Sequence, residues 1–164
     1  MVAERAGASI GTVYRYFPDR IAVLQSVSAR AVDRFVDRVR TTLGATEHTT
    51  WWDAIDSLID EGVDAFAHEP AFAALRFGDV IDLRPRESDR TGSSLVSAEI
   101  ASVLVSRYGF TDNPDLHFRL EVLFNLVDSL LSRAFAFDKN GDKAFIAEAR
   151  AVARSYFAGH YGQP

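Results

Sequence analysis

Cysteine is absent from this 164-residue chain. Without it, neither a disulfide framework nor a thiolate metal site can form, and a reducing compartment is the default expectation. Long apolar runs are also missing. No stretch approaches the roughly 20 uninterrupted apolar residues of a membrane helix, and the first residues contain no apolar signal core. We therefore expect a cytoplasmic protein with no membrane partner and no targeting segment.

An excess of positive charge is lacking as well. The 18 lysine and arginine residues are outnumbered by 23 aspartate and glutamate residues, and the formal net charge is -5. This balance argues against a chain coated along its length by nucleic acid, but it is compatible with a small local DNA-binding segment. Local charge gives only weak support for such a segment, because residues 4–20 are only marginally basic.

Catalytic and metal-binding motifs are missing too. The four histidines are scattered and form no His-Glu-x-x-His pattern. Segment 7–12 lacks the Gly-Lys-Thr element of a phosphate-binding loop. Segment 138–142 begins like a calcium loop but lacks the required glycine position and the closing glutamate. Since no nucleophile is arranged with a base either, we expect no enzyme, no metal site and no cofactor.

The sequence does have helical periodicity almost everywhere. Apolar residues recur at spacings of three and four, without sustained period-two alternation, so the pattern predicts an all-α protein. Turn-forming residues in 83–94 predict a loop, and segment 138–142 predicts a turn that joins the last two helices into a hairpin. The expected helices cover residues 20–43, 51–69, 71–78, 95–108, 115–137 and 143–160.

The first 24 residues follow a helix-turn-helix pattern. Residues 2–6 have the character of a helix end, residues 7–9 form a tight turn with a capping serine, and residues 10–17 form a second short helix. One side of this second helix carries apolar residues that can face the core of the module: Ile10, Val13 and Phe17. The opposite side carries small or polar residues that leave room for DNA: Gly11, Thr12 and Arg15.

Residues 2–20, VAERAGASIGTVYRYFPDR, resemble the signature of the tetracycline-repressor (TetR) family of transcriptional regulators. The resemblance is carried by the order Ala-Gly, capping serine, Gly-Thr, tyrosine, Tyr-Phe and a basic residue that opens the next helix. The rest of the chain lacks a family motif but has the expected form, since a TetR-like effector domain is all-helical. We therefore expect a partial helix-turn-helix module in residues 1–24 and a helical ligand-binding and dimerisation domain in residues 25–164.

The resemblance implies a DNA-binding role for one set of residues. Ser9 would cap the recognition helix, Gly11 would let the backbone approach DNA, and Arg15 would contact a base edge. The implied DNA-binding residues are Ser9, Ile10, Gly11, Thr12, Tyr14, Arg15, Tyr16 and Arg20.

The other members of this set are expected to contact mainly the DNA backbone. The hydroxyls of Tyr14 and Tyr16 would bind phosphates, and Arg20 would anchor a phosphate near the start of the next helix. Thr12 would meet a phosphate or a base. Ile10 remains ambiguous, because it can pack inward or touch a thymine methyl group. The alternative for the whole set is a helical hairpin whose tyrosines and arginines only extend along a surface.

A DNA-binding module of this family has a full helix, and usually a basic arm, before the segment at which this sequence begins. We therefore expect that the chain is an N-terminally truncated form that binds DNA weakly or not at all. Tight, salt-sensitive operator binding in a gel-shift assay would contradict this expectation.

Aromatic residues are more numerous than a small bundle needs, and helical bundles often hold ligands between their helices. Polar residues lie among them and could orient a ligand. The alternatives are that the aromatic residues simply form the core and that the polar ones satisfy one another or face solvent. The predicted ligand-binding residues are Trp51, Phe66, Arg76, Phe77, Phe124, Asn125 and Asp128.

Apolar stripes run along both of the last two expected helices. Such stripes can be buried in each other or in a partner, and the resemblance favours a partner, in a four-helix interface with twofold symmetry. The predicted dimer-interface residues are Leu120, Leu123, Val127, Leu130, Val152 and Tyr156.

These expectations combine into one predicted function. The chain is expected to be a ligand-responsive regulator, a repressor that binds a palindromic double-stranded DNA operator as a homodimer and is released by a small, mostly apolar effector. The helix over 20–43 would couple the two activities, since it joins the DNA-binding module to the bundle. The alternative is a dimeric helical ligand-binding or protein-interaction module that does not bind DNA.

Overall fold

The computed structural model describes residues 2–16, 19–45, 48–69 and 92–164, and within these ranges it is helical without any strand. This confirms the predicted all-α class. The described helices are α1 (Val2–Arg5), α2 (Ile10–Tyr16), α3 (Arg20–Gly44), α4 (Trp51–His68), α6 (Gly92–Tyr108), α7 (Pro114–Phe135) and α8 (Lys143–Tyr161).

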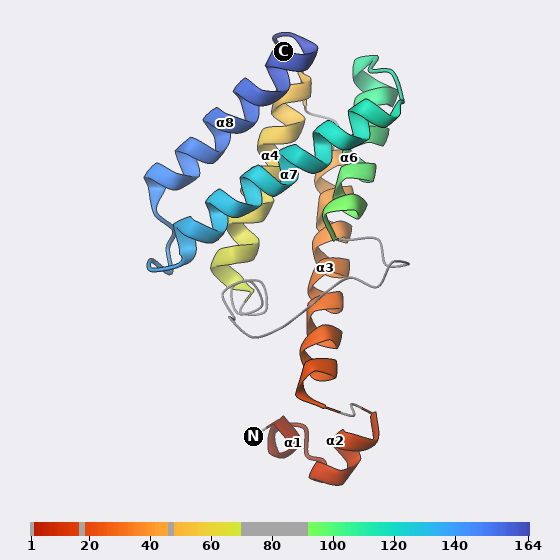
Figure 1. Ribbon diagram of the computed structural model, residues 1–164, viewed down its shortest axis with the longest axis vertical. Helices are drawn as coiled ribbons and strands as arrows, with labels where there is room; N and C mark the ends of the chain where they lie inside the picture. The colour runs from red at the N-terminus through yellow and green to blue at the C-terminus, as the bar shows by residue number, and fades with distance from the viewer. Residues whose placement is uncertain (1, 17–18, 46–47, 70–91) are drawn as a thin grey trace.

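The long helix α3 connects two unequal parts of the molecule. The short helices α1 and α2 lie beyond its N-terminal end, whereas its C-terminal half packs against α4 and α6 (Figure 1). Helix α7 crosses the bundle in contact with α4, α6 and α8. Helix α3 therefore connects the DNA-binding candidate to the helical bundle.

Short polar side chains explain where the helices begin. Asp19 accepts a hydrogen bond from the backbone N–H of Ala22 at 2.7 Å, which caps α3. Thr50 and Asp53 form a reciprocal capping box at the start of α4. Asn113 caps α7. These caps satisfy backbone groups that have no partner within the helix.

The hydrophobic core lies in the helical bundle, away from α1 and α2 (Figure 1). Its described members run from Ala31 to Phe157 and come from α3, α4, α6, α7 and α8. Arg107 of α6 donates hydrogen bonds to the backbone oxygens of Gly44 and Ala45, which ties α6 to the end of α3. The described core residues of α3 begin at Ala31 and end at Leu43.

The end of α8 is attached to the start of α7. The Tyr161 hydroxyl donates a hydrogen bond to Oδ2 of Asp115 at 3.2 Å. Burial, together with this bond, raises the pKa of Tyr161 to about 12. The hydroxyl therefore remains a donor throughout the physiological pH range.

One predicted boundary is wrong. Residues 92–94 were expected to end a loop, but they form the first turn of α6. Glycine and serine are acceptable there because the first four N–H groups of a helix need no intrahelical acceptor. The rest of that predicted loop, residues 83–91, and the expected helix over 71–78 lie outside the described residues.

Candidate functional site

The turn between α1 and α2 has the geometry that the sequence predicts. Gly7 adopts a φ of 60°, the left-handed region in which glycine carries no steric cost, and its N–H donates to the Glu4 carbonyl oxygen at 3.2 Å. Ser9 Oγ accepts the N–H of Thr12 at 3.1 Å. The chain therefore reverses at Gly7 and restarts as a helix that Ser9 caps.

Most of the predicted DNA-binding side chains are exposed on α2. Tyr16 and Tyr14 are 73% and 54% exposed, and Thr12 and Arg15 are exposed too. Ile10 is 53% exposed, which favours contact with a thymine methyl group over inward packing. Within α2, only Val13 is half-buried. The side chain of Arg20 lies outside the described part of the structure.

Two short residues shape the start of this surface. The hydroxyls of Ser9 and Thr12 are 2.9 Å apart, so the cap also fixes the position of the threonine hydroxyl. A Cβ atom built on Gly11 would meet only Ser9 Oγ, at 3.8 Å, which is ordinary contact. The backbone at Gly11 is thus open to close approach from outside rather than required for packing inside.

Removing the cap should loosen this helix. We expect Ser9→Ala to cost α2 about 1 kcal/mol, because the Thr12 N–H loses its acceptor. Amide hydrogen exchange should then be about fivefold faster at Thr12. Ser9→Thr should preserve the protection, since threonine also caps. As a control, Ser106→Ala removes an exposed serine on α6 and should leave exchange in α2 unchanged. Unchanged protection at Thr12 in Ser9→Ala would contradict this account.

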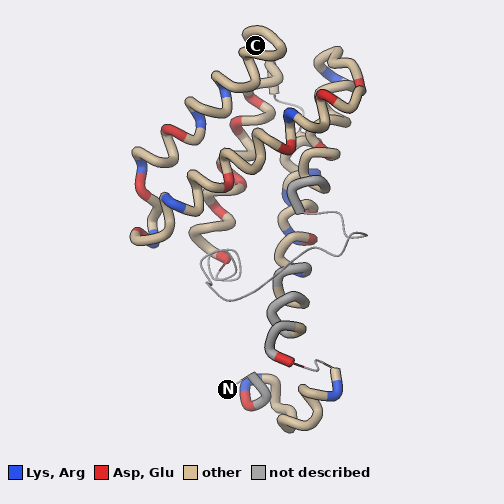
Figure 2. The backbone as a smooth tube through the Cα atoms, viewed as in Figure 1, with Lys and Arg blue, Asp and Glu red and all other residues tan. Residues whose placement is uncertain are grey.

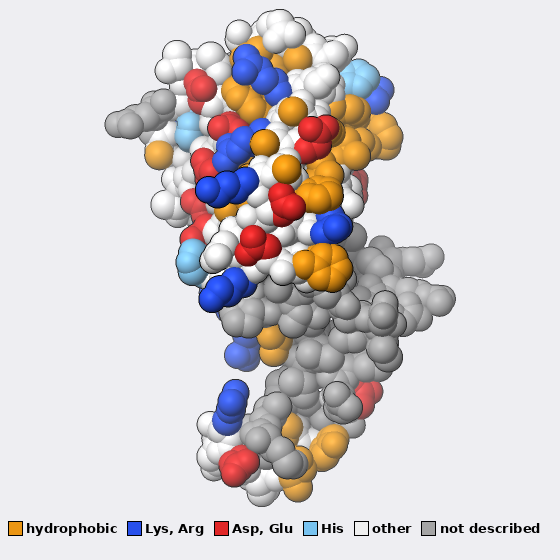
Figure 3. All heavy atoms as spheres, turned by 90° about the vertical axis from the view of Figure 1, so that its left-hand side faces the viewer, with side chains coloured by type: hydrophobic (Ala, Val, Ile, Leu, Met, Phe, Trp, Pro, Cys, Tyr) orange, Lys and Arg blue, Asp and Glu red, His pale blue; other side chains and the backbone are white. Residues whose placement is uncertain are grey.

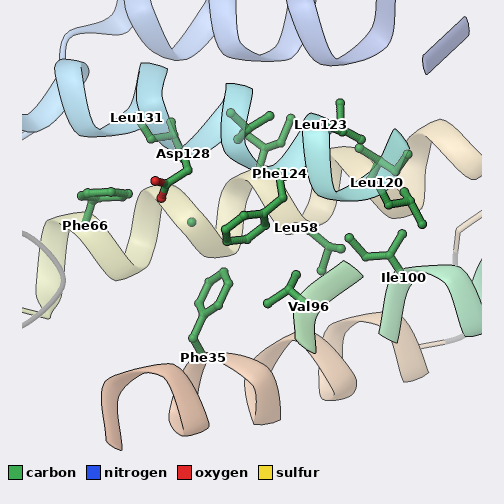
Figure 4. A pocket seen from close by; sticks show the side chains of 14 residues that line it. Phe35, Leu58, Phe66, Val96, Ile100, Leu120, Leu123, Phe124, Asp128 and Leu131 are labelled. Carbon is green, nitrogen blue, oxygen red and sulfur yellow. The ribbon is translucent and has the colours of Figure 1, made fainter. Parts of the chain in front are cut away.

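A cavity, which we call the central cavity, lies where α3, α4, α6 and α7 meet (Figure 4). It contains ≈ 560 Å³ of space not filled by atoms, part of it open to solvent. The lining residues that the structure describes are Phe35, Ile55, Leu58, Ile59, Gly62, Phe66, Val96, Ile100, Leu120, Leu123, Phe124, Val127, Asp128 and Leu131.

Only some of the residues predicted to bind a ligand line the central cavity. Phe66, Phe124 and Asp128 line the central cavity together. Trp51 does not, because it packs against Phe157 with ring centroids 5.3 Å apart. Asn125 is exposed and donates its side-chain N–H to the Glu121 carbonyl oxygen of its own helix. Arg76 and Phe77 lie outside the described residues.

Several walls of the cavity were not predicted. Phe35 comes from α3, Val96 and Ile100 come from α6, and all three belong to apolar patterns that the sequence presents only as core (Figure 4). Spacing identifies such residues as inward-facing but does not say whether the inside is filled. Only the angle at which four helices cross decides that.

Gly62 brings α4 close to α7 at one wall of the cavity. A Cβ atom at this position would lie 2.9 Å from Cδ1 of Leu131, so any larger residue has to displace that side chain. Glycine in a helix interior costs about 1 kcal/mol relative to alanine. Here the cost is offset by a close helix crossing beside the cavity.

A cluster of ion pairs joins α3 to α4 just outside the cavity. Arg38 contacts Asp64 and Glu69 at 3.0 Å each, and Glu61 at 3.8 Å. Its guanidinium carbon also lies 5.8 Å from the ring centroid of Phe35. One arginine on α3 therefore contacts both a cavity wall and carboxylates of α4 and of its C-cap residue.

Comparisons with known proteins relate this architecture to a known family. The family profile described as "Tetracyclin repressor-like, C-terminal domain" matches residues 49–161, which include α4, α6, α7 and α8. The chain belongs to the TetR family. A comparison with curated proteins gave no match. Among solved structures, a TetR-family transcriptional regulator from Streptomyces coelicolor is similar, with a TM-score of 0.75 and 25% sequence identity over 96% of this chain and 84% of that one.

The two comparisons complement each other for this TetR-family regulator. The profile covers the bundle that contains most of the central cavity, whereas α1 and α2 lie before its first matched residue. The structural similarity spans nearly the whole chain and so includes the helix-turn-helix. The family resemblance read from residues 2–20 is thus confirmed by evidence from a different part of the chain.

The last two helices of this TetR-family chain have apolar residues on their inward and on their outward sides. The predicted dimer-interface residues come from both sides. Leu120 and Leu123 are buried, and with Val127 they line the central cavity of this chain, so these three side chains face inward. The partner contact of the set stays a prediction. Helix α7 is apolar on more than one side, and spacing alone does not choose between the sides. Leu130 and Tyr156 are only half-buried.

The outward side of α7 and α8 keeps apolar surface. Phe118 is 55% exposed and Leu126 is 37% exposed on α7, and Val152 and Tyr156 border a shallow depression on α8. Figure 3 shows part of this surface, with hydrophobic side chains exposed among charged ones. Of these four residues, only Val152 and Tyr156 belong to the predicted dimer interface.

Two kinds of feature are absent from the described ranges. No helix within those ranges is long and apolar enough to cross a membrane. Among the same residues, no three histidine, cysteine, aspartate or glutamate side chains come together as a possible metal site.

Proposed function

We propose that this TetR-family regulator is a ligand-responsive repressor. It binds a palindromic operator as a homodimer through α2 and is released when a small, mostly apolar effector occupies the central cavity. The observation that carries this proposal is that α3 leads directly from the recognition helix to the cavity. Asp19 caps α3 shortly after the recognition helix ends, and Phe35 of the same helix lines the cavity.

The Arg38 cluster supports coupling through α3. An effector that displaces Phe35 changes the surface on which Arg38 lies, and Arg38 is held to Asp64 of α4 and to Glu69, which caps the end of α4. A helix that extends from the cavity to α2 converts a small tilt at Phe35 into a larger displacement at the recognition helix. In a dimer, this displacement changes the spacing of the two recognition helices and hence their fit to two half-sites.

Dimerisation is proposed through the outward side of α7 and α8. The residues that remain available there are Phe118, Leu126, Leu130, Val152 and Tyr156. A twofold axis across this side gives an isologous interface, which a symmetric operator requires. Light scattering coupled to size-exclusion chromatography should therefore give the mass of two chains.

Operator selection tests the proposal directly. The product of the whole reading frame, including any residues encoded before Met1, is incubated with random DNA duplexes, and the bound pool is sequenced. We expect inverted repeats whose binding weakens as the salt concentration rises. Arg15→Ala should relax base preference at one position in each half-site, by about 1–3 kcal/mol, because Arg15 is the proposed base contact.

Tyr16→Phe is the matched control for that experiment. It removes one exposed hydroxyl and should weaken binding to all sequences about equally, because a phosphate contact carries no base information. The absence of any enriched inverted repeat would favour the second candidate, a dimeric ligand-binding module without DNA binding. The observation that favours this candidate is the weak positive charge of segment 4–20, with three arginines and two acidic residues.

Figure 2 shows how charge is distributed over the two parts. Acidic and basic residues alternate along the bundle helices, and the helix-turn-helix carries few charges of either sign. Phosphate binding by this part would therefore depend strongly on tyrosine and threonine hydroxyls and on backbone N–H groups. The salt dependence of operator binding should be correspondingly shallow for a DNA-binding dimer, though clearly present.

A further inference from the structure

We propose that the outward side of α7 pairs with α7 of a second copy of this chain, in the antiparallel direction and in one register. Arg133 of each protomer then lies beside the partner's Asp115. This inference rests on the proposed homodimer. It adds the direction of the pairing, its register and the two charged residues that determine both.

One stripe along the outward side of α7 has the same spacing in both directions. Its members Asp115, Val122, Leu126 and Arg133 are separated by seven, four and seven residues. Steps of four and seven stay on one side of a helix with 3.6 residues per turn, so these side chains lie along one line. An antiparallel copy centred midway between Val122 and Leu126 therefore places apolar residues opposite apolar ones and acid opposite base.

The stripe is accessible in the protomer. The side chain of Asp115 is 58% exposed, Leu126 is 37% exposed, Arg133 is exposed and Val122 is half-buried. Phe118, on the same outward side, is 55% exposed and would lie close to the partner's Leu130 in this register. A second copy would thus remove apolar surface from water, which stabilises the pair.

Arg133 is positioned for an anion from outside its own chain. Its guanidinium carbon lies 4.9 Å from the ring centroid of Phe137 and 4.9 Å from that of Phe145. Such stacking uses the faces of the guanidinium and leaves the N–H donors at its edge available. Within the described part of the chain, Arg133 has these ring contacts and no ion pair. Its charge is therefore oriented but not neutralised by the protomer.

Asp115 has partners already, but it can accept one more donor. Its Oδ1 accepts from Nε of Arg119 and its Oδ2 accepts from the Tyr161 hydroxyl, at 3.2 Å each. The two oxygens of a carboxylate offer about four lone-pair positions, so a further N–H fits without displacing either donor. Pairing with the partner's Arg133 would extend this network rather than break it.

The charges at the two ends of the stripe select the direction. The acid lies at the N-terminal end of α7 and the base lies at the C-terminal end, so antiparallel copies bring opposite charges together. Parallel copies would place Arg133 beside the partner's Arg133. A twofold axis repeats each contact, so the pair with Asp115 forms twice. The acidic residues of the next turn, Asp138 and Asp142, lie beyond the stripe and accept backbone N–H groups there.

Charge reversal tests this pairing. Arg133→Glu and Asp115→Arg each bring like charges together at both pairs, so each should weaken dimerisation at least about tenfold at low salt, measured by sedimentation equilibrium. A mixture of the two variants restores opposite charges at both pairs, but only in the heterodimer. Native mass spectrometry of an equimolar mixture should therefore give a heterodimer share well above the about one half expected from random pairing.

Two controls separate this effect from damage to the protomer. Arg30→Glu makes the same change of charge at an exposed position of α3, which packs against α4 and α6, and it should alter the dissociation constant less than about twofold. Thermal unfolding checks each fold. If Asp115→Arg is unstable because Tyr161 loses its acceptor, Arg133→Glu decides alone. Its weakening should then shrink as sodium chloride rises from about 50 mM to about 500 mM.

The outcomes separate this pairing from the proposed function. Random pairing of two folded variants, or an undiminished dimer in folded Arg133→Glu, would overturn the antiparallel register, whereas the homodimer itself would stand. A monomeric unaltered chain would overturn the homodimer and the pairing together. Preferential heterodimers would support the pairing even if no operator is selected.

Discussion

Replacing Phe157 with alanine is expected to lower the free energy of unfolding by about 3–5 kcal/mol, which is a large part of the stability of a typical domain. Phe157 is fully buried in α8. Its ring centroid lies 5.3 Å from that of Trp51, 5.9 Å from that of Phe110 and 4.7 Å from that of Tyr161. Alanine leaves a cavity among these rings, and rigid aromatic neighbours collapse poorly into such a space.

The measurement is urea unfolding followed by circular dichroism at one fixed protein concentration, because association of the protomers shifts apparent stability. Phe137→Ala is the matched control. Phe137 is 87% exposed and contacts mainly the guanidinium of Arg133, 4.9 Å from its ring centroid. Its replacement should cost less than about 1 kcal/mol. Similar losses for the two variants would mean that Phe157 is not the centre of the aromatic cluster.

Gly141→Ala is expected to destabilise the protein by about 2–4 kcal/mol, for two separate reasons. Gly141 has a φ of +78°, a region that L side chains rarely adopt. An added Cβ would also lie 2.7 Å from Cζ of Phe135 and 2.9 Å from Cδ1 of Ile146. The turn between α7 and α8 would have to open to make room.

The chain offers a control that separates these two reasons. Gly109 has a similar φ of +73°, but nothing lies within 4 Å of the position of its Cβ. Gly109→Ala should therefore cost only the backbone strain, about 1–2 kcal/mol. The difference between the two variants in urea unfolding measures the crowding at Phe135 and Ile146. If both variants lose the same stability, crowding contributes nothing and the turn can relax.

The turn at Gly141 also bears on function. The Gly141 N–H donates to the Asp138 carbonyl oxygen at 3.0 Å, and the Asp142 N–H donates to the Ala134 carbonyl oxygen at 2.9 Å. These bonds fix the angle between α7 and α8, the helices whose outward side is proposed to pair in the dimer. Gly141→Ala should therefore weaken dimerisation more than Gly109→Ala does, since Gly109 lies at the far end of the α7–α8 hairpin.

The local structure of this protein follows from its sequence. The period of its apolar residues predicts the helices, and the residues at which helices begin include the capping Asp19 and Thr50. The turn of the helix-turn-helix is equally local, because Gly7 and Ser9 form it with partners at most three residues away. Such features need no distant contact, and therefore composition and spacing suffice to predict them.

The cavity and the partner surface depend on the tertiary structure. Leu123 and Leu130 both belong to the apolar stripe that predicted the interface, yet Leu123 lines the cavity and Leu130 does not. Helix α7 is apolar on more than one side, so only its packing against α4 and α6 decides which side turns inward. In the same way, Phe35 and Asp128 are far apart in the sequence, and only the tertiary packing places both on one cavity.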